Sequence, residues 1–359
     1  MLYSFLRPFL FSVDPERAHH LAIAALRLLQ AAPASLSPPS DSRLSQQVWG
    51  LHFPNPVGLA AGYDKNAAVP LVWSALGLGF AELGTITAKA QPGNPKPRIF
   101  RLGQDEALIN RLGFNNDGAT AIAQRLTGIL PPSRSHPVPL GFNIGKSKVT
   151  PLDEAESDYL FSLEQLFPFA DYLVVNVSSP NTPELRKLQE SERLGRLLEA
   201  LQARNKQLAT QAKIAPKPLL VKIAPDLTDD EIKEVARVTQ SVGVAGLIAT
   251  NTTITRPPLH TPIKEDGGLS GKPLAARACE VLRVLYRAVD GKLPLIGVGG
   301  IFSAEDAYAR IRAGASLVQI YTGLIYQGPL LPRTIVHGLR ARLTHDGLNH
   351  IRDAVGKDV

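Results

Sequence analysis

The stretch 171–182, DYLVVNVSSPNT, joins an apolar run to a cluster of small polar side chains. Its first half is apolar and β-branched, which is typical of a strand buried on both faces. The cluster consists of Asn176, Ser178, Ser179 and Asn181. Pro180 ends the strand and restricts the turn. A polar cap on a strand end would explain one such residue. Four of them, at the strand end where α/β folds bind their ligands, indicate a functional site.

Other apolar runs of the chain also end in small or polar residues. They supply Ala61, Gly62, Lys65, Thr85, Asn143, Lys222, Thr250, Asn251 and Thr252. A cofactor that lies flat across the ends of the strands needs several hydrogen-bond donors and close approach of the backbone, which small residues permit. The pattern therefore predicts a cofactor site built from many strand ends.

Two glycine-containing segments predict a phosphate site. GVGGI (297–301) and IYTG (320–323) lie at the ends of the seventh and eighth apolar runs. Barrels bind phosphate with the loops after their last two strands, where glycine amides and a helix N-terminus face the anion. A lone GVGG could equally allow close packing of a strand against a helix. The phosphate site is favoured because GVGGI and IYTG follow the seventh and eighth predicted strands.

Eight apolar runs predict the fold. The runs are 56–62, 80–87, 139–145, 171–179, 218–225, 246–252, 294–301 and 317–323. Eight strands with helices between most of them indicate an α/β fold of the TIM (β/α)8 barrel type, and a doubly wound sheet is the alternative. A hairpin is expected at 48–53.

Two long insertions interrupt the alternation of strands and helices. The first, 91–118, is expected to lie over the barrel mouth, and the glycine-rich second, 255–273, to act as a lid or to face phosphate.

Two amphipathic helices are expected before the first barrel strand. Apolar residues recur at helical spacing from Leu2 to Leu10, and Asp14 followed by Pro15 signals the start of a second helix. His19 and His20 on that helix are expected to be surface or interface groups. A Pro/Ser-rich link, 31–42, follows. Both helices would either pack on the main domain or form an interfacial pair that meets a membrane or a lipidic ligand, and periodicity alone leaves both open.

Composition excludes several classes of function. The 359 residues are 44% apolar and 20% charged, which is enough for a sizeable core. The net charge of +7 suits anionic ligands or an anionic membrane surface, but the basic residues are scattered, so no nucleic-acid partner is expected. The single cysteine, Cys279, excludes an internal disulfide, indicates a reducing compartment and is expected to be buried on a helix.

The chain lacks the motifs of several other chemistries. It has no HExxH, no paired Cys/His ligand set and no GxSxG, so neither a metal site nor a serine-hydrolase site is expected. No apolar run approaches the roughly 20 residues of a membrane-spanning helix. The N-terminal segment carries charges that a signal peptide should lack, and it is expected to be retained.

Taken in order, the motifs resemble those of the dihydroorotate dehydrogenases. The resemblance covers about residues 2–328 and rests on AAGYDK, GTIT with QPGNPKPR, NRLGFNN, FNIGK, NVSSPNTPELR, VKIAPD, ATNTT, GGLSG, GVGGI and ASLVQIYTG. The N-terminal extension, and Ser179 at the position of the base, resemble the membrane-associated, quinone-dependent class 2 enzymes. The soluble class 1 enzymes use cysteine there and lack the extension.

The resemblance implies an FMN-dependent oxidoreductase. It would oxidise (S)-dihydroorotate to orotate in de novo pyrimidine (UMP) biosynthesis, with FMN as hydride acceptor and a membrane quinone as final electron acceptor. Ser179 would be the catalytic base that takes the proton from C5 while hydride leaves C6, and Phe114 and Thr182 would line the route by which the proton leaves. Lys65 would meet the substrate carboxylate, and Lys222 would stabilise charge on the reduced flavin.

The resemblance also implies two sets of binding residues. The substrate set is Lys65, Asn110, Arg111, Leu112, Gly113, Phe114, Asn176, Asn181, Asn251 and Thr252. The cofactor set is Ala61, Gly62, Tyr63, Asp64, Lys65, Thr85, Asn143, Asn176, Lys222, Thr250, Gly271, Gly300, Tyr321 and Thr322. Many members carry leucine where this chain has Tyr63, and the resemblance assigns that tyrosine no role.

The implied domain organisation has three parts. Residues 1–40 would form the helical pair that gives the quinone its access, residues 45–340 the FMN-binding barrel, and residues 341–359 a tail without chemistry, with a basic surface helix beyond about residue 335. The protein would lie at the cell membrane, peripherally and on the cytoplasmic side. The alternatives are a soluble class 1 enzyme that uses fumarate or NAD, and a non-catalytic membrane-associated barrel.

Overall fold

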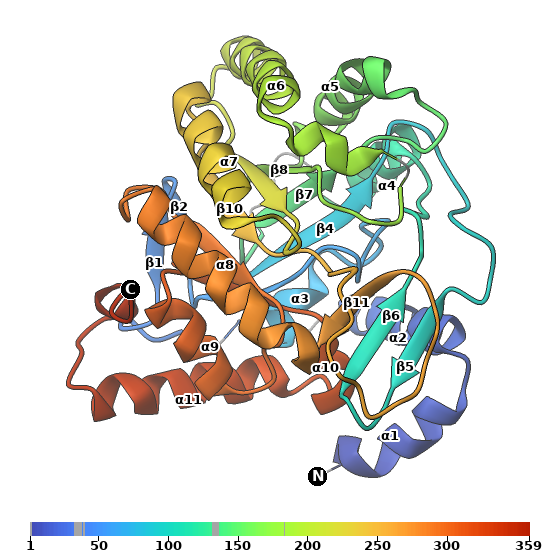
Figure 1. Cartoon of the computed structure of the whole chain (residues 1–359), viewed down its shortest axis with the longest axis vertical. Helices are drawn as coiled ribbons and strands as arrows, with labels where there is room; N and C mark the ends of the chain where they lie inside the picture. Colours follow the sequence, from blue (N-terminus) through green and yellow to red (C-terminus); the bar gives the residue numbers. More distant parts are fainter. Residues whose placement is uncertain (1, 32–37, 39, 131–135, 183) are drawn as a thin grey trace.

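Eight parallel strands close into a barrel (Figure 1). The computed structural model describes residues 2–31, 38, 40–130, 136–182 and 184–359. The barrel strands are β3 (Val57–Leu59), β4 (Phe80–Ile86), β7 (Leu140–Ile144), β8 (Tyr172–Asn176), β9 (Leu219–Ile223), β10 (Gly246–Ala249), β12 (Leu295–Val298) and β13 (Leu317–Ile320). They pair in that order, and β13 pairs with β3 to close the ring. Each of the eight predicted runs contains one strand, which confirms the TIM barrel.

Helices surround the barrel on its outside (Figure 1). They are α3 (Val72–Ala75), α4 (Ala119–Ile129), α5 (Ala155–Leu166), α6 (Ser191–Ala212), α7 (Asp229–Val242), α8 (Ala275–Ala288), α9 (Ala304–Arg312), α10 (Thr322–Gln327) and α11 (Leu331–His345). Local sequence sets their ends: Thr228 and Glu231 form a capping box at the start of α7, and Gly243 ends that helix with φ of 73°. Cys279 is buried on α8, as predicted.

The interior of the barrel has an apolar lower layer. The predicted hairpin is confirmed as β1 (Gln46–Val48) and β2 (Leu51–Phe53), which pair antiparallel. The Phe53 ring packs edge-to-face on Phe80, with 5.4 Å between ring centroids. Phe80, Leu220 and Leu317 belong to this buried cluster. Because side chains alternate along a strand, the residues two positions later point inward one layer higher, toward the strands' carboxyl ends.

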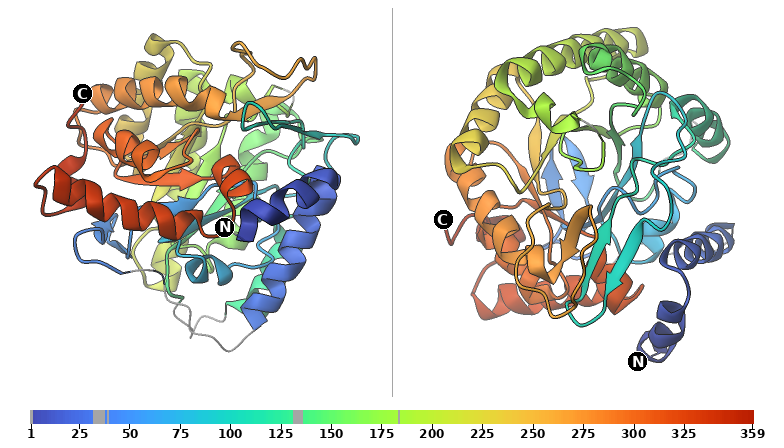
Figure 2. Two further views of the ribbon diagram at one scale, coloured as in Figure 1. Left: turned by 90° about the horizontal axis from the view of Figure 1, so that it is seen from below. Right: turned by 45° about the vertical axis from the view of Figure 1, so that its right-hand side comes forward.

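The two N-terminal helices lie together beside the barrel (Figure 2). α1 (Leu2–Ser12) and α2 (Pro15–Ala31) begin and end close to the predicted limits, and Asp14 Oδ1 accepts hydrogen bonds from the first amides of α2. A buried ion pair joins α2 to the first insertion, since Arg98 donates to both Glu16 oxygens at 2.6 and 3.1 Å. No helix among the described residues is long and apolar enough to cross a membrane.

The two long insertions meet in a small sheet. β5 (Ile99–Leu102) and β6 (Ala107–Asn110) come from the first insertion, and β11 (Gly268–Gly271) comes from the second. β6 pairs antiparallel with both neighbours, and Gly268 lies opposite Asn110. The glycine-rich second insertion is therefore partly a strand rather than a free loop. In Figure 1 this sheet lies on the side of the barrel that carries α1 and α2, and α2 contacts β5.

The C-terminal part of the chain is packed on the barrel. α11 runs across residue 340 and buries Ile335, Val336, Leu339 and Leu343, so the helix expected in the tail is a covering helix of the barrel. Beyond it, the Ile351 amide donates to Arg43 O, and Arg312 forms an ion pair with Asp358. The last residues therefore hold the end of α9 and the start of the hairpin together.

Candidate active site

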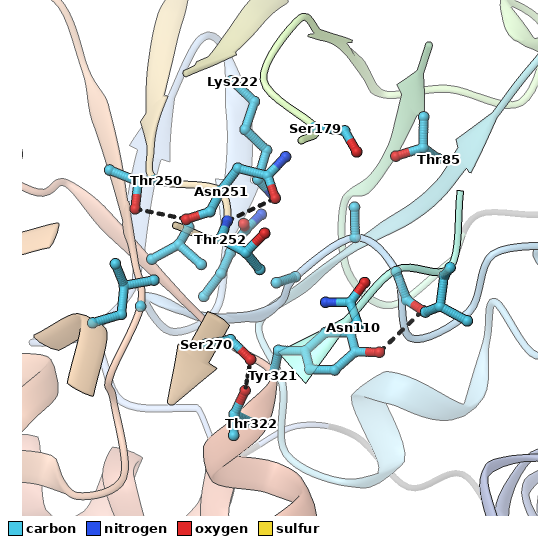
Figure 3. Close-up of a pocket in the computed structure, with 18 of the residues that line it drawn as sticks. Thr85, Asn110, Ser179, Lys222, Thr250, Asn251, Thr252, Ser270, Tyr321 and Thr322 are labelled. Carbon is cyan, nitrogen blue, oxygen red and sulfur yellow. Dashed lines mark hydrogen bonds between the residues drawn. The ribbon is translucent and has the colours of Figure 1, made fainter. Parts of the chain in front are cut away.

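A cavity opens at the carboxyl ends of the barrel strands (Figure 3). Most of the predicted residues line it: Ala61, Gly62, Lys65, Thr85, Asn110, Leu112, Gly113, Phe114, Asn176, Ser179, Asn181, Lys222, Thr250, Asn251, Thr252, Gly271, Gly300, Tyr321 and Thr322. They come from segments as far apart as residues 61 and 322. In Figure 3, Ser179 and Asn251 face the same space from different strands, and the Tyr321 ring lies across another side of it.

Four predicted residues lie outside the lining of this cavity. Asp64 is buried behind the AAGYDK turn, where its carboxylate accepts hydrogen bonds from the amides of Ala68 and Val69. Asn143 is fully buried beneath Thr85. Tyr63 lines a second cavity, and Arg111 lies on the outer side of the mouth in an ion pair with Glu265.

A network of amides and hydroxyls forms one wall. Asn176 Nδ2 donates to Thr85 Oγ1 at 2.9 Å and to Asn143 Oδ1 at 3.1 Å. Asn176 Oδ1 accepts from Ser178 Oγ at 3.0 Å, and Asn251 Nδ2 donates to Ser178 Oγ at 3.0 Å. These bonds fix which edge of each amide faces the cavity. Amides held in this way recognise a ligand by the positions of its donors and acceptors.

Ser179 is a buried serine at the cavity wall, with 5% of its surface exposed. Among the described residues, its Oγ has one hydrogen-bond partner, the Asn181 amide at 3.3 Å. The hydroxyl therefore keeps a lone pair and its own proton for other partners. Three residues further on, Thr182 Oγ1 is buried and has no protein partner within the described part of the chain.

Lys65 is one of two lysines that line the cavity, the other being Lys222. Burial lowers the pKa of the Lys65 ammonium to about 8, and the nearby charges of Glu16 and Asp64 partly oppose that shift. An ammonium with little solvation binds an anion more strongly than one in water. The residue also lines the second cavity, so both spaces share it.

The first insertion supplies the outer wall. Asn181 Nδ2 donates to Asn110 O at 3.1 Å and to Asn110 Oδ1 at 3.3 Å, which joins the turn after β8 to the end of β6. Phe114 adopts a left-handed φ of 53°, a conformation that is rare for a bulky residue and usually marks a constrained position. Both insertions are thus needed to complete the cavity.

The far end of the cavity suits a phosphate group. Gly271 has φ of 98°, and a Cβ there would lie 2.3 Å from Glu106 O, so only glycine fits. Gly300 has φ of 69° and would clash with Ala275 in the same way. Ser270 Oγ and Thr322 Oγ1 lie 2.9 Å apart, and both side chains line the cavity. Hydroxyls and bare backbone are the groups that approach phosphate oxygens closely.

Three relevant residues were not predicted from the sequence. Ser270 and Gln319 line the cavity, and Glu82 lies fully buried next to Lys222, with 3.3 Å between Glu82 Oε1 and Lys222 Nζ. Strand alternation contained a signal for the carboxylate, because Glu82 is two residues after inward-pointing Phe80. Ser270 had no comparable signal, since it lies in an insertion whose pairing is long-range.

A second cavity of about 410 Å³ lies between the helical pair and the barrel. Apolar side chains of α1 and α2 form one side, and Tyr63, Trp73, Arg101 and Tyr321 form the other. Tyr63 packs edge-to-face on Tyr321 with 5.7 Å between ring centroids. Lys65 and Tyr321 line both cavities, so the two spaces adjoin at these side chains.

One of the two helix histidines lies in this second cavity. His19 lies against Tyr63, with 5.3 Å between ring centroids, and burial lowers the pKa of its imidazole to about 3, helped by the Lys65 charge. The imidazole is therefore neutral at physiological pH. His20 has 66% of its side chain exposed, so His20 is a surface group and His19 lies at the interface of α2 with the barrel, in line with the prediction.

Comparison with known proteins identifies the family. The family model described as dihydroorotate dehydrogenase matches residues 43–343. A curated dihydroorotate dehydrogenase (quinone) of Acidithiobacillus ferrooxidans is 52% identical over 99% of both chains, and one of Gloeobacter violaceus is 51% identical over 99% of this chain and 98% of its own. The crystal structure of DHODH from Eimeria tenella in complex with ferulenol has a TM-score of 0.89 and 42% identity, and covers 96% of both chains. The chain thus belongs to the dihydroorotate dehydrogenase family.

Proposed function

We propose that this protein oxidises (S)-dihydroorotate to orotate in de novo pyrimidine biosynthesis and passes the electrons through FMN to a membrane quinone. The family is flavin-dependent in general, and the curated relatives named above are quinone-dependent enzymes. One observation carries the proposal: Ser179, Lys65 and a set of fixed amides line one cavity, which meets a second, apolar cavity at Lys65 and Tyr321. The first suits a polar anion, and the second suits an apolar acceptor.

FMN fits the first cavity by the chemistry of its walls. Ser270, Gly271, Gly300 and Thr322 would hold the phosphate, since a side chain at either glycine would clash with the backbone or with Ala275. Thr85, Asn176, Lys222 and Thr250 would hold the rings, with Asn143 supporting Thr85 from below. Bound FMN supplies an acceptor for hydride from substrate C6 and a donor of electrons to quinone. Lys222 would place a fixed cation beside the charge that accumulates on reduction.

The substrate would lie between the amide wall and the first insertion. Lys65 would bind its carboxylate, and Asn110, Asn176, Asn181 and Asn251 would bind the ring. Each amide is already oriented by protein hydrogen bonds, so little freedom is lost when the ligand binds.

Ser179 would take the proton from substrate C5. A neutral serine is a weak base, so its Oγ must release its own proton as it gains another, in a pocket that excludes most water. Two observations support this role: among the described residues, Ser179 Oγ has a single protein partner, and the buried hydroxyl of Thr182 has none. Thr182 and Phe114 would line the path along which the proton leaves.

The helical pair would bring the protein to the membrane and the quinone to the second cavity. Phe5, Phe9 and Leu28 expose 81%, 71% and 77% of their surface, which is unusual for large apolar residues. Helices with such a face lie in the membrane interface and do not cross the bilayer. We infer a peripheral location on the cytoplasmic side of the cell membrane, with quinone reaching Tyr63, His19 and Tyr321 between α1 and α2.

A stopped-flow absorbance experiment tests the proposal. The purified yellow protein is mixed anaerobically with dihydroorotate, and then with a short-chain ubiquinone or with fumarate. The expected result is bleaching by dihydroorotate and fast recovery with quinone alone. Recovery with fumarate alone would indicate a class 1 enzyme instead. No bleaching of a flavin-loaded protein would refute the substrate, and a purified protein without flavin would favour a non-catalytic barrel.

A further inference from the structure

Glu82 is a fully buried carboxylate in the middle of the barrel. It lies on β4, two residues after Phe80, and none of its surface is exposed. Its inward layer also contains Lys222, two residues after Leu220, and Gln319, two residues after Leu317. A polar layer above an apolar one is costly, because burying charges in a protein interior loses their hydration. Hydrophobic residues would fill the same space at lower cost.

Three polar side chains from other strands donate to the carboxylate. Asn143 Nδ2 donates to Glu82 Oε1 at 2.7 Å, and Lys222 Nζ lies 3.3 Å from the same oxygen. Gln319 Nε2 donates to Oε2 at 2.6 Å. Both oxygens accept hydrogen bonds and no acceptor among these three partners faces them, which is the arrangement that suits a carboxylate without a proton. Tyr172 Oη, the other polar atom of this region, has no partner within the described residues, and the charge of Glu82 adds to the burial that raises the pKa of its phenol.

The carboxylate lies one layer below the cofactor cavity. Lys222 and Gln319 line that cavity, whereas Glu82 and Asn143 are covered by the residues that do. Gln319 Oε1 has no partner among the described residues although it is buried. Its Nε2 is committed to Glu82, so the orientation of this amide is set from below and not from the cavity.

We propose that Glu82 is a positioning residue that holds Lys222, Asn143 and Gln319 beneath the flavin and whose charge lowers the reduction potential of that flavin. This inference rests on the proposed function, since it requires flavin in the first cavity. Lys222 alone would favour added electrons, and a carboxylate at 3.3 Å from its ammonium opposes that effect. The pair therefore sets how far reduction by dihydroorotate proceeds and how readily quinone is reduced in turn.

Glu82→Gln separates charge from shape. The amide oxygen of the new glutamine can accept hydrogen bonds from Asn143 and Lys222. Its amide nitrogen can donate to Gln319 Oε1 once the Gln319 amide has rotated. That rotation breaks no hydrogen bond of Oε1, which has no partner among the described residues. The expected result is a shift of at least about tenfold toward the reduced form, which is about 30 mV to more positive potential for a two-electron couple. Glu82→Asp keeps the charge and should stay closer to the parent value.

The measurement is a spectroelectrochemical titration of the flavin-loaded protein against a redox dye of known potential. Asp158→Asn is the matched control, since Asp158 is 5% exposed, accepts from the Ser147 amide and from Thr150, and does not line the cavity. Its potential should equal that of the parent. An unchanged or more negative potential in flavin-loaded Glu82→Gln would overturn the inference and leave the proposed function intact. Absence of flavin from the parent protein would refute the proposed function instead.

If Glu82→Gln does not fold or does not bind flavin, a comparison of two Lys222 variants tests the inference. Lys222→Gln leaves the Glu82 carboxylate without its cation, so the reduction potential of the flavin in this variant should fall. The double variant Lys222→Gln/Glu82→Gln replaces the ion pair by two neutral amides, so its flavin reduction potential should return toward the parent value. A double variant with the same potential as Lys222→Gln would show that the carboxylate has no effect on the flavin.

Discussion

Lys65 combines a functional position with an unusual charge environment. Its ammonium lines both cavities and is buried, which lowers its pKa to about 8. It is cationic below that value and becomes neutral as the pH rises through it. If it binds the substrate carboxylate, affinity must depend on pH in the same range.

Binding of dihydroorotate is expected to weaken about tenfold between pH 7 and pH 9, because the charged fraction of Lys65 falls by about that factor across a pKa near 8. The dissociation constant comes from the dependence of anaerobic flavin bleaching on substrate concentration. Lys65→Met should bind weakly and independently of pH. A flat profile in the parent protein would contradict the assignment.

Adjacent serines at the end of β8 allow a second prediction. Ser179→Ala should slow flavin reduction by about 10²-fold or more, because it removes the proposed general base, while flavin still binds. Ser178→Ala is the matched control: its hydroxyl is fully buried and orients Asn176 and Asn251, so its loss should weaken substrate binding more than it slows the saturated rate. Stopped-flow traces at several substrate concentrations separate the two effects.

A conservative change at the same position tests the chemistry further. Ser179→Cys should retain partial activity, with its optimum moved to lower pH, because a thiol ionises more readily than an alcohol. Reduction of Ser179→Ala at an undiminished rate would show that another group takes the proton.

Among the elements, the helical pair of α1 and α2 has two faces of different character. The buried Glu16–Arg98 pair attaches α2 to the first insertion, and Arg98 also donates to the carbonyls of Pro92 and Asn94 at 2.7 Å. The outer face carries exposed Phe5 and Phe9. One face of the pair therefore packs on the first insertion, and the other exposes large apolar side chains, which is the face proposed above to meet the membrane.

The double change Phe5→Glu and Phe9→Glu should reduce co-sedimentation with anionic lipid vesicles by at least about tenfold, since each buried phenylalanine contributes on the order of 1.5–3 kcal/mol. Turnover with a short-chain quinone should persist, because neither side chain lines the second cavity. Phe161→Glu is the control: Phe161 is 41% exposed on α5, which lies away from the helical pair in Figure 1. Equal vesicle binding by all three proteins would exclude the helical pair as the membrane contact.

For the whole molecule, the C-terminal segment closes the packing around the barrel. Ile351 and Ala354 are fully buried, and Gly356 N donates to Ile311 O at 3.2 Å at the end of α9. This segment thus belongs to the core although it lies far from either cavity.

Ile351→Ala should lower the free energy of unfolding by about 2–5 kcal/mol, because it leaves a cavity at a fully buried position. Arg352→Ala is the matched neighbour, with 74% of its side chain exposed, and should change stability by less than about 0.5 kcal/mol. Denaturant unfolding of the flavin-loaded proteins measures both. Similar losses would mean that the segment is not part of the cooperative core.

Apolar patterning predicted the eight strands and the residues at their ends, and the family resemblance predicted most of the remaining cavity lining. Alternation of apolar runs with helical segments specifies eight parallel strands, and parallel strands bring their carboxyl ends to one face. The order of the strands alone therefore predicts that residues at those ends, such as Lys65, Ser179 and Asn251, lie close together. Local signals also sufficed for the hairpin and for the cap at Asp14.

Features that depend on pairing between distant segments could not be predicted from the sequence. The sheet β5–β6–β11 joins insertions about 160 residues apart, as shown by the pairing of Asn110 with Gly268, and no local pattern specifies that register. The same holds for Tyr63, which lies in the second cavity because α2 covers it, and for Asn143, which lies below Thr85. Glu82 is the clearest case: its three donors come from three other strands, so its role exists only once the barrel has closed.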